Sequence, residues 1–378
     1  MKERELQKYL RKCRLLPVEP GPVVAGFRCA AVIPACDELE EIGNTLASLA
    51  PGADDMVLLV VNHPADAPSW VKAASGELLR LLASGAFSCR NLFWIDAPDL
   101  TGGVGEARKL GMDAVIASCH AEQAERVILA SLDADTVAEP DYFDAVRGCF
   151  ERNPAASALS IPFSHRPGAT PEEERAIRSY EAYLERYVDR LRRAGSPYAF
   201  QTVGSAFAVR AAAYVRAGGM RVRKGGEDFY FLQAAAKTGR VVTGDRVLVH
   251  PSPRPSDRVP FGTGPAVRKL MAGEAPAEIS DAAFAFLGRL LARAAGPGGL
   301  EEAELFLDQI DSCSADFLRQ EGFLLIWPKV LANTPDRRDA RLAAFHGWFD
   351  GLKTLRYLHR IDRFCGNGIP SVAGKKRI

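Results

Sequence analysis

The stretch VILASLDAD, residues 127–135, decides the fold, because an apolar strand runs directly into two carboxylates separated by one residue. In open α/β sheets, ligands bind at the carboxyl ends of strands, so Asp133 and Asp135 stand where a site is expected. Two acids this close repel each other unless a cation lies between them, and carboxylate oxygens are preferred ligands of hard divalent cations. Asp-x-Asp is also a common turn tripeptide, and its position at a strand end favours the metal-binding interpretation.

Apolar runs alternate with helical stretches on both sides of this strand, which is typical of a mainly parallel sheet flanked by helices. The expected strands span residues 29–34, 56–62, 91–95, 126–132 and 156–161. The expected helices between them span residues 38–49, 67–82, 106–117 and 141–152. The run VLLVV, residues 57–61, is apolar without alternation, as expected of a strand buried on both faces.

The second half of the chain becomes helical. A long helix is predicted to begin at Thr170, with Pro171 in its first turn and Glu173 completing a capping box. The following elements are a strand at 206–210, a helix at 228–238 and a strand pair across 240–250 that turns at Gly244-Asp245. Helices are then expected at 284–294, 300–309, 317–331 and 337–361. We therefore predict an N-terminal helical segment (1–28), a catalytic domain (29–270) and a C-terminal helical domain with a loose tail (271–378).

The composition excludes several classes of function. The chain has 378 residues, 47% of them hydrophobic, and a net charge of +1 without a basic run outside its last residues, so nucleic acid is not an expected partner. Its eight cysteines contain no Cys-x-x-Cys pair, which favours reduced thiols over a disulfide framework or a zinc site. We find no signal peptide and no apolar run of the ~18 residues that a transmembrane helix needs. The expected location is the cytoplasm, with peripheral membrane contact allowed.

Three further motifs carry polar chemistry. Glu227 and Asp228 follow two glycines and precede an apolar helix, where acids also favour the positive end of the helix. His250 ends a strand just before a proline, and a lone histidine is more often structural than a ligand. The glycine-rich segment 102–105 precedes a helix that carries Arg108, and such an entry can present backbone N–H groups to phosphate.

In this order, the motifs resemble glycosyltransferase family 2, whose members have the GT-A fold, a Rossmann-like α/β fold. The resemblance covers about residues 29–265. The segment VIPACDE, residues 32–38, is similar to the opening strand and turn that hold the nucleotide, which implies binding roles for Pro34, Ala35 and Glu38. Asn62 ends the second strand, where the family usually has an acidic residue that reads the base.

The resemblance extends to the sugar and the diphosphate. Residues 103–111 are similar to the next nucleotide-contacting segment, which implies binding roles for Gly103 and Arg108. Asp133 and Asp135 match the element that grips ribose, diphosphate and Mg²⁺ or Mn²⁺. Gly204 begins a segment similar to the one that shapes the sugar pocket.

The remaining roles concern catalysis and closure. Glu227-Asp228 matches the pair whose aspartate is the catalytic base, and His250 is placed like the histidine that completes the metal shell in related GT-A enzymes. The loop 251–264, rich in Pro, Gly, Ser and Arg, is expected to act as a lid in which Arg254 and Arg258 face the diphosphate.

The resulting hypothesis is a metal-dependent glycosyltransferase of the hexosyltransferase type. It would move a sugar from a UDP- or GDP-type donor to an acceptor hydroxyl, with inversion. A retaining GT-A transferase and a non-catalytic sugar-nucleotide-binding protein are the alternatives. A sugar-1-phosphate nucleotidyltransferase is disfavoured, because it needs a basic glycine-rich loop after the first strand and this chain has Asp37 and Glu38 there.

Overall fold

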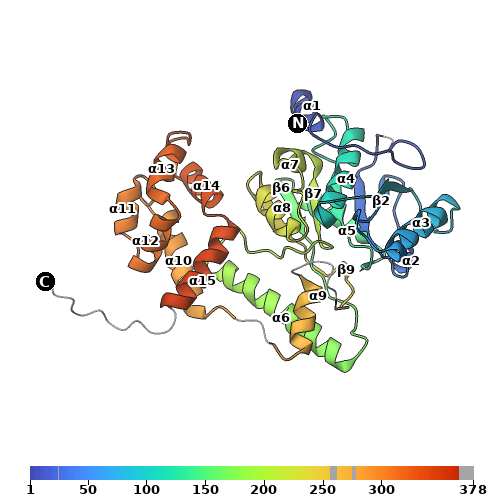
Figure 1. The fold of residues 1–378 in the computed structure, drawn as a ribbon. Coiled ribbons are helices and arrows are strands. Elements are labelled where there is room, and N and C mark those ends of the chain that lie inside the picture. Colours follow the sequence, from blue (N-terminus) through green and yellow to red (C-terminus); the bar gives the residue numbers. More distant parts are fainter. Residues whose placement is uncertain (24, 256–261, 275–277, 366–378) are drawn as a thin grey trace. The chain divides into compact units, whose positions relative to one another are not determined.

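The computed structural model describes residues 1–23, 25–255, 262–274 and 278–365 (Figure 1). The chain divides into two compact units. The first contains Met1–Ala182 and Phe200–Ala275, and the second contains Tyr183–Ala199 and Pro276–Ile378. No helix in the described ranges combines the length and the apolar character that a membrane crossing requires.

Within the described residues, a seven-stranded sheet forms the centre of the first unit. In spatial order its strands are β3 (Leu92–Ala97), β2 (Asp55–Asn62), β1 (Cys29–Ala35), β4 (Ile128–Ser131), β7 (Phe207–Arg210), β6 (Ala156–Ser160) and β8 (Arg240–Thr243). Strands β1 to β4 are parallel, β6 is parallel to β8, and β7 is antiparallel to both of its neighbours. The predicted mainly parallel sheet is confirmed.

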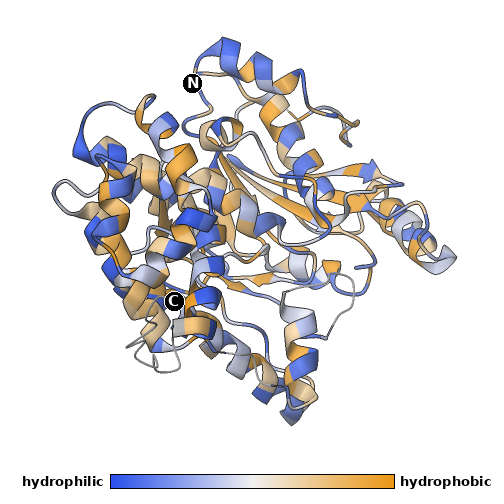
Figure 2. Cartoon of the chain, turned by 60° about the vertical axis from the view of Figure 1, so that its left-hand side comes forward, coloured by the Kyte–Doolittle hydropathy of each residue, from blue (hydrophilic) through white to orange (hydrophobic). Residues whose placement is uncertain are grey.

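The strands form where the sequence is apolar without alternation. Every residue of β1 and of β2 is buried, so both faces of these strands are covered. Figure 2 shows the strands of this sheet largely in the orange of hydrophobic residues. Burial of apolar surface on both faces is therefore what holds these strands in the interior.

Helices flank the sheet, as predicted. The helices that begin in the first unit are α1 (Glu3–Leu10), α2 (Ile42–Ser48), α3 (Ser69–Ala83), α4 (Gly103–Ser118), α5 (Tyr142–Arg152), α6 (Pro171–Arg193), α7 (Ala211–Arg216), α8 (Glu227–Ala236) and α9 (Thr263–Met271). Helix α4 packs on β1 and β2, and α8 packs on β6 and β8. A Cβ at Gly111 would lie 2.4 Å from Val32 Cγ1 and 2.9 Å from Val60 Cγ2, so glycine is what lets α4 approach the sheet this closely.

The N-terminal helix α1 is anchored to the first unit by one buried carboxylate. The Tyr9 hydroxyl donates to Asp113 Oδ1 in α4 at 2.6 Å, and the Tyr214 hydroxyl of α7 donates to the same oxygen at 2.9 Å. Lys109 Nζ donates to the other oxygen of Asp113 at 2.7 Å. The charge of Asp113 is therefore satisfied by three partners, and α1 is part of the folded unit.

The predicted strand pair across 240–250 is wrong. Strand β8 pairs with β6, whereas β9 (Val249–His250) pairs with β5 (Val137–Ala138) in a separate two-stranded sheet. The N–H groups of Gly244 and Leu248 donate to the carbonyls of Ser160 and Pro162. The chain thus continues alongside the segment that follows β6 and does not turn back on itself.

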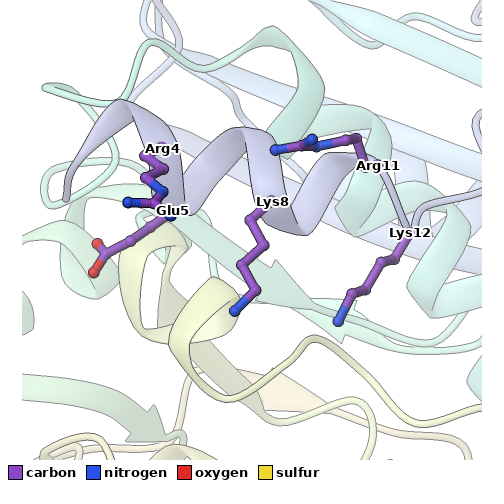
Figure 3. A pocket seen from close by; sticks show the side chains of 5 residues that line it. All are labelled: Arg4, Glu5, Lys8, Arg11 and Lys12. Carbon is purple, nitrogen blue, oxygen red and sulfur yellow. The ribbon is translucent and has the colours of Figure 1, made fainter.

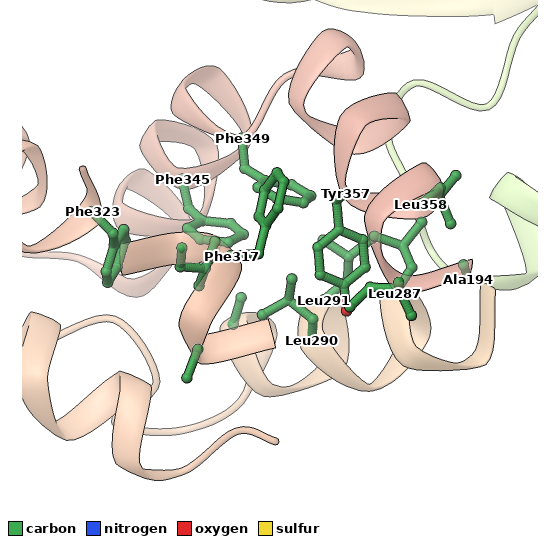
Figure 4. Close-up of a cluster of buried hydrophobic side chains, with 14 of the residues drawn as sticks. Ala194, Leu287, Leu290, Leu291, Phe317, Phe323, Phe345, Phe349, Tyr357 and Leu358 are labelled. Atoms are coloured by element: carbon green, nitrogen blue, oxygen red, sulfur yellow. The ribbon is translucent and has the colours of Figure 1, made fainter. Parts of the chain in front are cut away.

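The second unit has an aromatic core of its own (Figure 4). Besides the end of α6, its helices are α10 (Asp281–Ala295), α11 (Ala303–Asp308), α12 (Ser312–Gln320), α13 (Phe323–Leu331), α14 (Arg338–Trp348) and α15 (Gly351–Cys365). Phe323 and Phe345 are fully buried in this core, and Trp327 donates its Nε1–H to the carbonyl of Leu300 at 3.2 Å. The helical prediction for this region is confirmed, but two of the predicted helices are each two helices. Residues 317–331 are divided at Gly322, which has φ of 80°, and residues 337–361 are divided at Phe349 and Asp350.

The cysteines mostly follow the expectation of free thiols. Among the described residues, six cysteines are thiols outside any disulfide bond: Cys13, Cys29, Cys36, Cys89, Cys119 and Cys149. Cys313 in α12 is disulfide-bonded, so the expectation of reduced thiols is wrong for this residue.

Candidate active site

The order of the strands defines where a ligand would bind. From β1 the chain proceeds to β2 and β3 on one side, and it returns to β4 on the other side. The gap between the carboxyl ends of β1 and β4 is therefore the switch point at which open α/β sheets bind ligands. Glu38 follows β1, and Asp133 and Asp135 follow β4. Three of the predicted site residues thus lie at this switch point.

A buried arginine connects the carboxylates around this point. Arg108 of α4 is 2% exposed, and its Nε donates to Glu227 Oε1 at 3.0 Å. Its Nη2 donates to Asp133 Oδ1 at 2.5 Å, and its Nη1 donates to Ser131 Oγ at 2.6 Å. Charge-assisted hydrogen bonds of this kind are roughly twice as strong as neutral ones. One guanidinium therefore fixes the acid after β4 and the acid that begins α8.

Gly204 lies directly against this guanidinium. Ser131 Oγ donates to the carbonyl of Gly204 at 2.7 Å, and a Cβ at position 204 would lie 2.4 Å from Arg108 Nη2. Any larger residue would displace the arginine from its carboxylates. The structure thus brings four predicted segments together. The contribution of Gly204 is to leave room for the Arg108 side chain.

The predicted phosphate cradle is occupied by the protein itself. The N–H groups of Thr101 and Gly102 donate to Glu106 Oε2 at 3.1 and 2.8 Å, and Gly105 N donates to Arg223 O at 3.1 Å. Arg108 donates from all three of its nitrogens to protein acceptors. A phosphate would therefore have to displace protein acceptors from the N–H groups of Thr101, Gly102 and Gly105 and from Arg108. The binding role expected for Gly103 stays a prediction.

Glu227 and Asp228 begin α8 and differ sharply in environment. Glu227 is 3% exposed and accepts from Arg108, whereas the half-buried Asp228 accepts from the N–H of Phe229 at 2.7 Å. Burial, followed by the negative charge of Glu227, raises the pKa of Asp228 to about 7. Hydrogen bonding to Phe229 and the charge of Arg108 act in the opposite direction. A carboxyl with this pKa is suited to exchange protons near neutral pH.

Asp135, a predicted metal ligand, faces arginine side chains. Arg254 Nη2 lies 3.3 Å from Asp135 Oδ2 and donates to Glu38 Oε1 at 2.6 Å. Arg166 Nη2 donates to the backbone carbonyl of Asp135 at 3.2 Å and to Glu41 Oε2 at 2.9 Å. A cationic side chain thus stands beside Asp135 where we expected a metal.

His250, the third predicted metal ligand, has partners at both ring nitrogens. Its Nδ1 lies 2.9 Å from the carbonyl of Ser164, and its Nε2 lies 2.8 Å from Glu139 Oε1. A carbonyl only accepts, so Nδ1 donates to Ser164, while Glu139 contacts Nε2, the nitrogen that binds the metal in many sites where Nδ1 donates to a carbonyl. Within the described residues, however, no three His, Cys, Asp or Glu side chains are gathered to hold a metal. The residue types fit a divalent cation, and in this arrangement Arg254 contacts Asp135 and Glu139 contacts His250.

The remaining predicted residues are more buried than a direct binding role suggests. Pro34 and Ala35 lie within β1 and are buried. Asn62 is 5% exposed, and its amide donates to the carbonyl of Val60 in its own strand at 2.9 Å. Arg258 lies outside the described residues.

Two residues that the sequence analysis overlooked support this site. Ser131 is the polar residue at the end of the apolar strand β4, and it bridges Arg108 and Gly204. Glu106 lies four residues after Gly102, in the first turn of α4, and its carboxylate accepts from backbone N–H groups at the start of this helix. Both signals were visible in the sequence as a polar residue in an apolar run and an acid after glycines.

A surface pocket lies elsewhere, on the exposed side of α1. It is lined by Arg4, Glu5, Lys8, Arg11 and Lys12 (Figure 3). None of the predicted site residues lines it, so this hollow is separate from the acids described above.

Several solved structures are similar to this chain. TarS 1–349 of S. aureus in complex with UDP-GlcNAc is 14% identical, with a TM-score of 0.43 and 89% of this chain and 92% of that chain covered. Mannosyltransferase PcManGT from Pyrobaculum calidifontis, in complex with GDP-Man and Mn²⁺, is 16% identical, with a TM-score of 0.41 and 92% and 94% covered. Glucosyl-3-phosphoglycerate synthase from Mycobacterium tuberculosis is 16% identical, with a TM-score of 0.39 and 66% and 79% covered.

No family model matches this chain, and no curated protein matches it. At such identities, similarity to a solved structure assigns no role to any residue of this chain.

Proposed function

We propose that this chain is a glycosyltransferase of the GT-A kind, which moves a sugar from a nucleoside-diphosphate sugar to an acceptor hydroxyl with inversion. The observation that carries the proposal is an ion-pair cluster at the switch point of the sheet, in which Arg108 joins Asp133 to Glu227. Glu227 is the neighbour of Asp228, and burial together with the charge of Glu227 raises the pKa of Asp228 to about 7. Raised carboxyl pKa values are found preferentially at functional sites.

The chemistry follows from this arrangement. The ionised Asp228 accepts the proton of the acceptor hydroxyl. At the same time the oxygen of that hydroxyl bonds to the anomeric carbon of the sugar, and the bond from this carbon to the diphosphate breaks. The negative charge that develops leaves with the nucleoside diphosphate. Arg254, which lies beside Glu38 and Asp135, suits that charge.

The donor is expected at the gap between β1 and β4. Asp133 would orient the ribose, because Arg108 holds one of its oxygens and leaves the side chain 38% exposed. Glu38 and the turn after β1 would border the base. In line with the sequence analysis, we place the enzyme in the cytoplasm, with a UDP- or GDP-type donor.

A divalent cation, Mg²⁺ or Mn²⁺, is the proposed cofactor, and it would neutralise charge on the diphosphate when bound. Asp135 and His250 would hold it, provided that Asp135 exchanges Arg254 for the cation and that His250 turns its Nε2 away from Glu139. The carboxylate and the imidazole are both suitable ligand types.

A screen for donor binding tests the proposal. We expect one nucleoside-diphosphate sugar to raise the melting temperature above the others, because a ligand that binds only the native state stabilises it by mass action. The measurement is thermal unfolding with UDP- and GDP-sugars, followed by product analysis with the winning donor. An α-linked donor that yields a β-linked product supports inversion, and retention supports the alternative mechanism. Donor binding without any transfer would favour the non-catalytic alternative.

Metal dependence forms a separate prediction. Calorimetry of UDP and GDP should show tighter binding with Mn²⁺ than with a chelator, and Asp135→Asn should remove most of this difference. Glu41→Gln is the matched control, since Glu41 pairs with Arg166 near the same turn and is no proposed ligand. Equal nucleotide affinity with and without the cation would contradict the metal site.

A further inference from the structure

Residues 221–224, Arg-Val-Arg-Lys, form an exposed cationic loop just before the acids of α8. All four residues are exposed. Within the described part of the chain, none of the three cationic side chains forms an ion pair with a carboxylate. Elsewhere in the same unit arginines pair readily, as Arg216 does with Glu125 and Arg246 does with Asp141. Positive charge is therefore left uncompensated at this position.

The cationic loop packs against the glycine-rich start of α4. Gly105 N donates to Arg223 O, and a Cβ at Gly105 would lie 2.7 Å from that oxygen and 2.8 Å from Arg221 O. A Cβ at Gly102 would lie 2.0 Å from Val222 Cγ1. Side chains at these two positions would push the cationic loop away. These glycines, which the sequence suggested for phosphate, therefore position cationic side chains.

Arg223 is further oriented by an aromatic ring. Its guanidinium carbon lies 3.9 Å from the centroid of the Tyr230 ring in α8. Stacking on an aromatic face leaves the edge of a guanidinium, with its N–H donors, free for a planar or tetrahedral anion. Glu106, the acid in the first turn of α4, already accepts from two backbone N–H groups and pairs with Arg14 at 3.2 Å.

The cationic loop is close to the proposed base. Only Gly225 and Gly226 separate Lys224 from Glu227, so the Cα atoms of Lys224 and Asp228 are at most about 15 Å apart. The side chains of the loop are long, so an acceptor that contacts both them and Asp228 has less than this distance to span. In an inverting displacement the acceptor attacks from the face opposite to the leaving diphosphate, so a group next to the base belongs to the acceptor.

We propose that Arg221, Arg223 and Lys224 bind an anionic group, a phosphate or a carboxylate, of the acceptor. This inference rests on the proposed glycosyltransferase function, because it takes Asp228 as the group that faces the acceptor. The same chemistry serves a soluble phosphorylated acceptor and the headgroup of an anionic lipid.

The test compares two variants of the full chain that lose the same charge. One carries Arg221→Gln, Arg223→Gln and Lys224→Gln, and the other carries the control changes Arg4→Gln, Lys8→Gln and Arg11→Gln on α1. The probes are inorganic phosphate and glycerol 3-phosphate, measured by calorimetry in the presence of saturating donor nucleotide. We expect the loop variant to bind both probes on the order of ten- to a hundredfold more weakly than the wild type, and the α1 variant to bind them as the wild type does.

The following outcomes would overturn the inference. They are no binding of either probe to the wild type, equal binding to the loop variant, and a comparable loss in the α1 variant. A loss of UDP or GDP affinity in the loop variant would also overturn it, since the loop would then serve the donor. Co-sedimentation with phosphatidylglycerol vesicles, against phosphatidylcholine vesicles, separates the two sources of the anion. Binding that the loop variant loses identifies a lipid headgroup, and binding of glycerol 3-phosphate alone identifies a soluble acceptor.

The proposed function can fail independently. If the wild type binds no nucleotide sugar, the glycosyltransferase assignment fails, while loss of phosphate binding in the loop variant alone still demonstrates the anion site.

Discussion

Asp228→Asn should lower the rate of sugar transfer by about 10²–10⁴-fold while donor binding stays nearly intact. The amide is almost isosteric with the carboxylate and still accepts the hydrogen bond from Phe229 N, so the start of α8 should be preserved. It cannot take a proton at neutral pH, and the catalytic step loses its base. The measurement is a transfer rate together with a donor dissociation constant. A variant that keeps more than about a tenth of the rate contradicts the assignment.

The pH dependence of the same step gives a second readout. A base must be deprotonated, so the wild-type rate should fall as the pH drops through about 7, where Asp228 gains its proton. Glu227→Gln is the matched variant, because the charge of Glu227 helps to raise the pKa of Asp228. We expect this variant to keep a base and to move the acidic limb of the profile to lower pH. An unshifted limb would show that another group limits the rate.

Stability should respond to Asp228 in the opposite sense to activity. Its folded pKa is raised above the ordinary value of 3.8, so between about pH 4 and 7 the folded chain holds a proton that the unfolded chain has released. The contribution of Asp228 to folding therefore becomes less favourable as the pH rises through this window. Asp228→Asn removes that dependence, and its melting temperature at pH 8 should be no lower than that of the wild type.

Arg108→Met should destabilise the fold by about 3–5 kcal/mol, the typical effect of removing one partner from a buried ion pair. The side chains of Arg108 and Glu227 are 3% and 4% exposed, so Glu227 would be left as a buried charge without its cation. Methionine fills much of the same volume, which confines the change to the lost charge and hydrogen bonds. The measurement is urea unfolding, with the free energy of unfolding extrapolated to water.

Two control variants are compared with Arg108→Met in the same measurement. Arg175→Gln removes an exposed pair with Glu172 on α6, and its free energy of unfolding should stay close to that of the wild type, because solvent screens such a pair. Arg108→Lys keeps the positive charge but not the planar fork that reaches Ser131, Asp133 and Glu227 at once, so an intermediate loss is expected. If Arg108→Met unfolds like the Arg175 control, Arg108 is not the group that holds the acids together.

Periodicity predicted most elements of the fold, because strands such as β1 and β2 are buried on both faces and consist of uninterrupted apolar residues. Periodicity could not predict which strands pair with one another. Residues 240–250 contain two apolar runs with Gly244 between them, and this pattern fits a hairpin as well as it fits a strand that continues along β6 and then joins β5. That choice depends on tertiary neighbours such as Pro162, which lies within 2.8 Å of where a Cβ at Gly244 would be.

The sequence indicated which residues of the candidate site lie together, but not how they contact one another. The sequence singled out Arg108, Asp133, Gly204 and Glu227, and the structure brings them into one connected cluster. It did not reveal that Arg108 is buried, since exposure depends on how α4 packs against the sheet. The partner of Asp135 was equally hidden, because Arg254 is more than a hundred residues away in the chain.

Helix α4 illustrates what such a cluster requires of the length of a helix. At about 100° per residue, Gly105, Arg108, Gly111 and Asp113 do not share one face of the helix. They meet the cationic loop, the acids of the site, the main sheet and helix α1 respectively. Inserting or deleting one residue between 105 and 113 would rotate the later contacts away from their partners together. A substitution at one of these positions affects one contact, whereas a change in the length of the helix affects several at once.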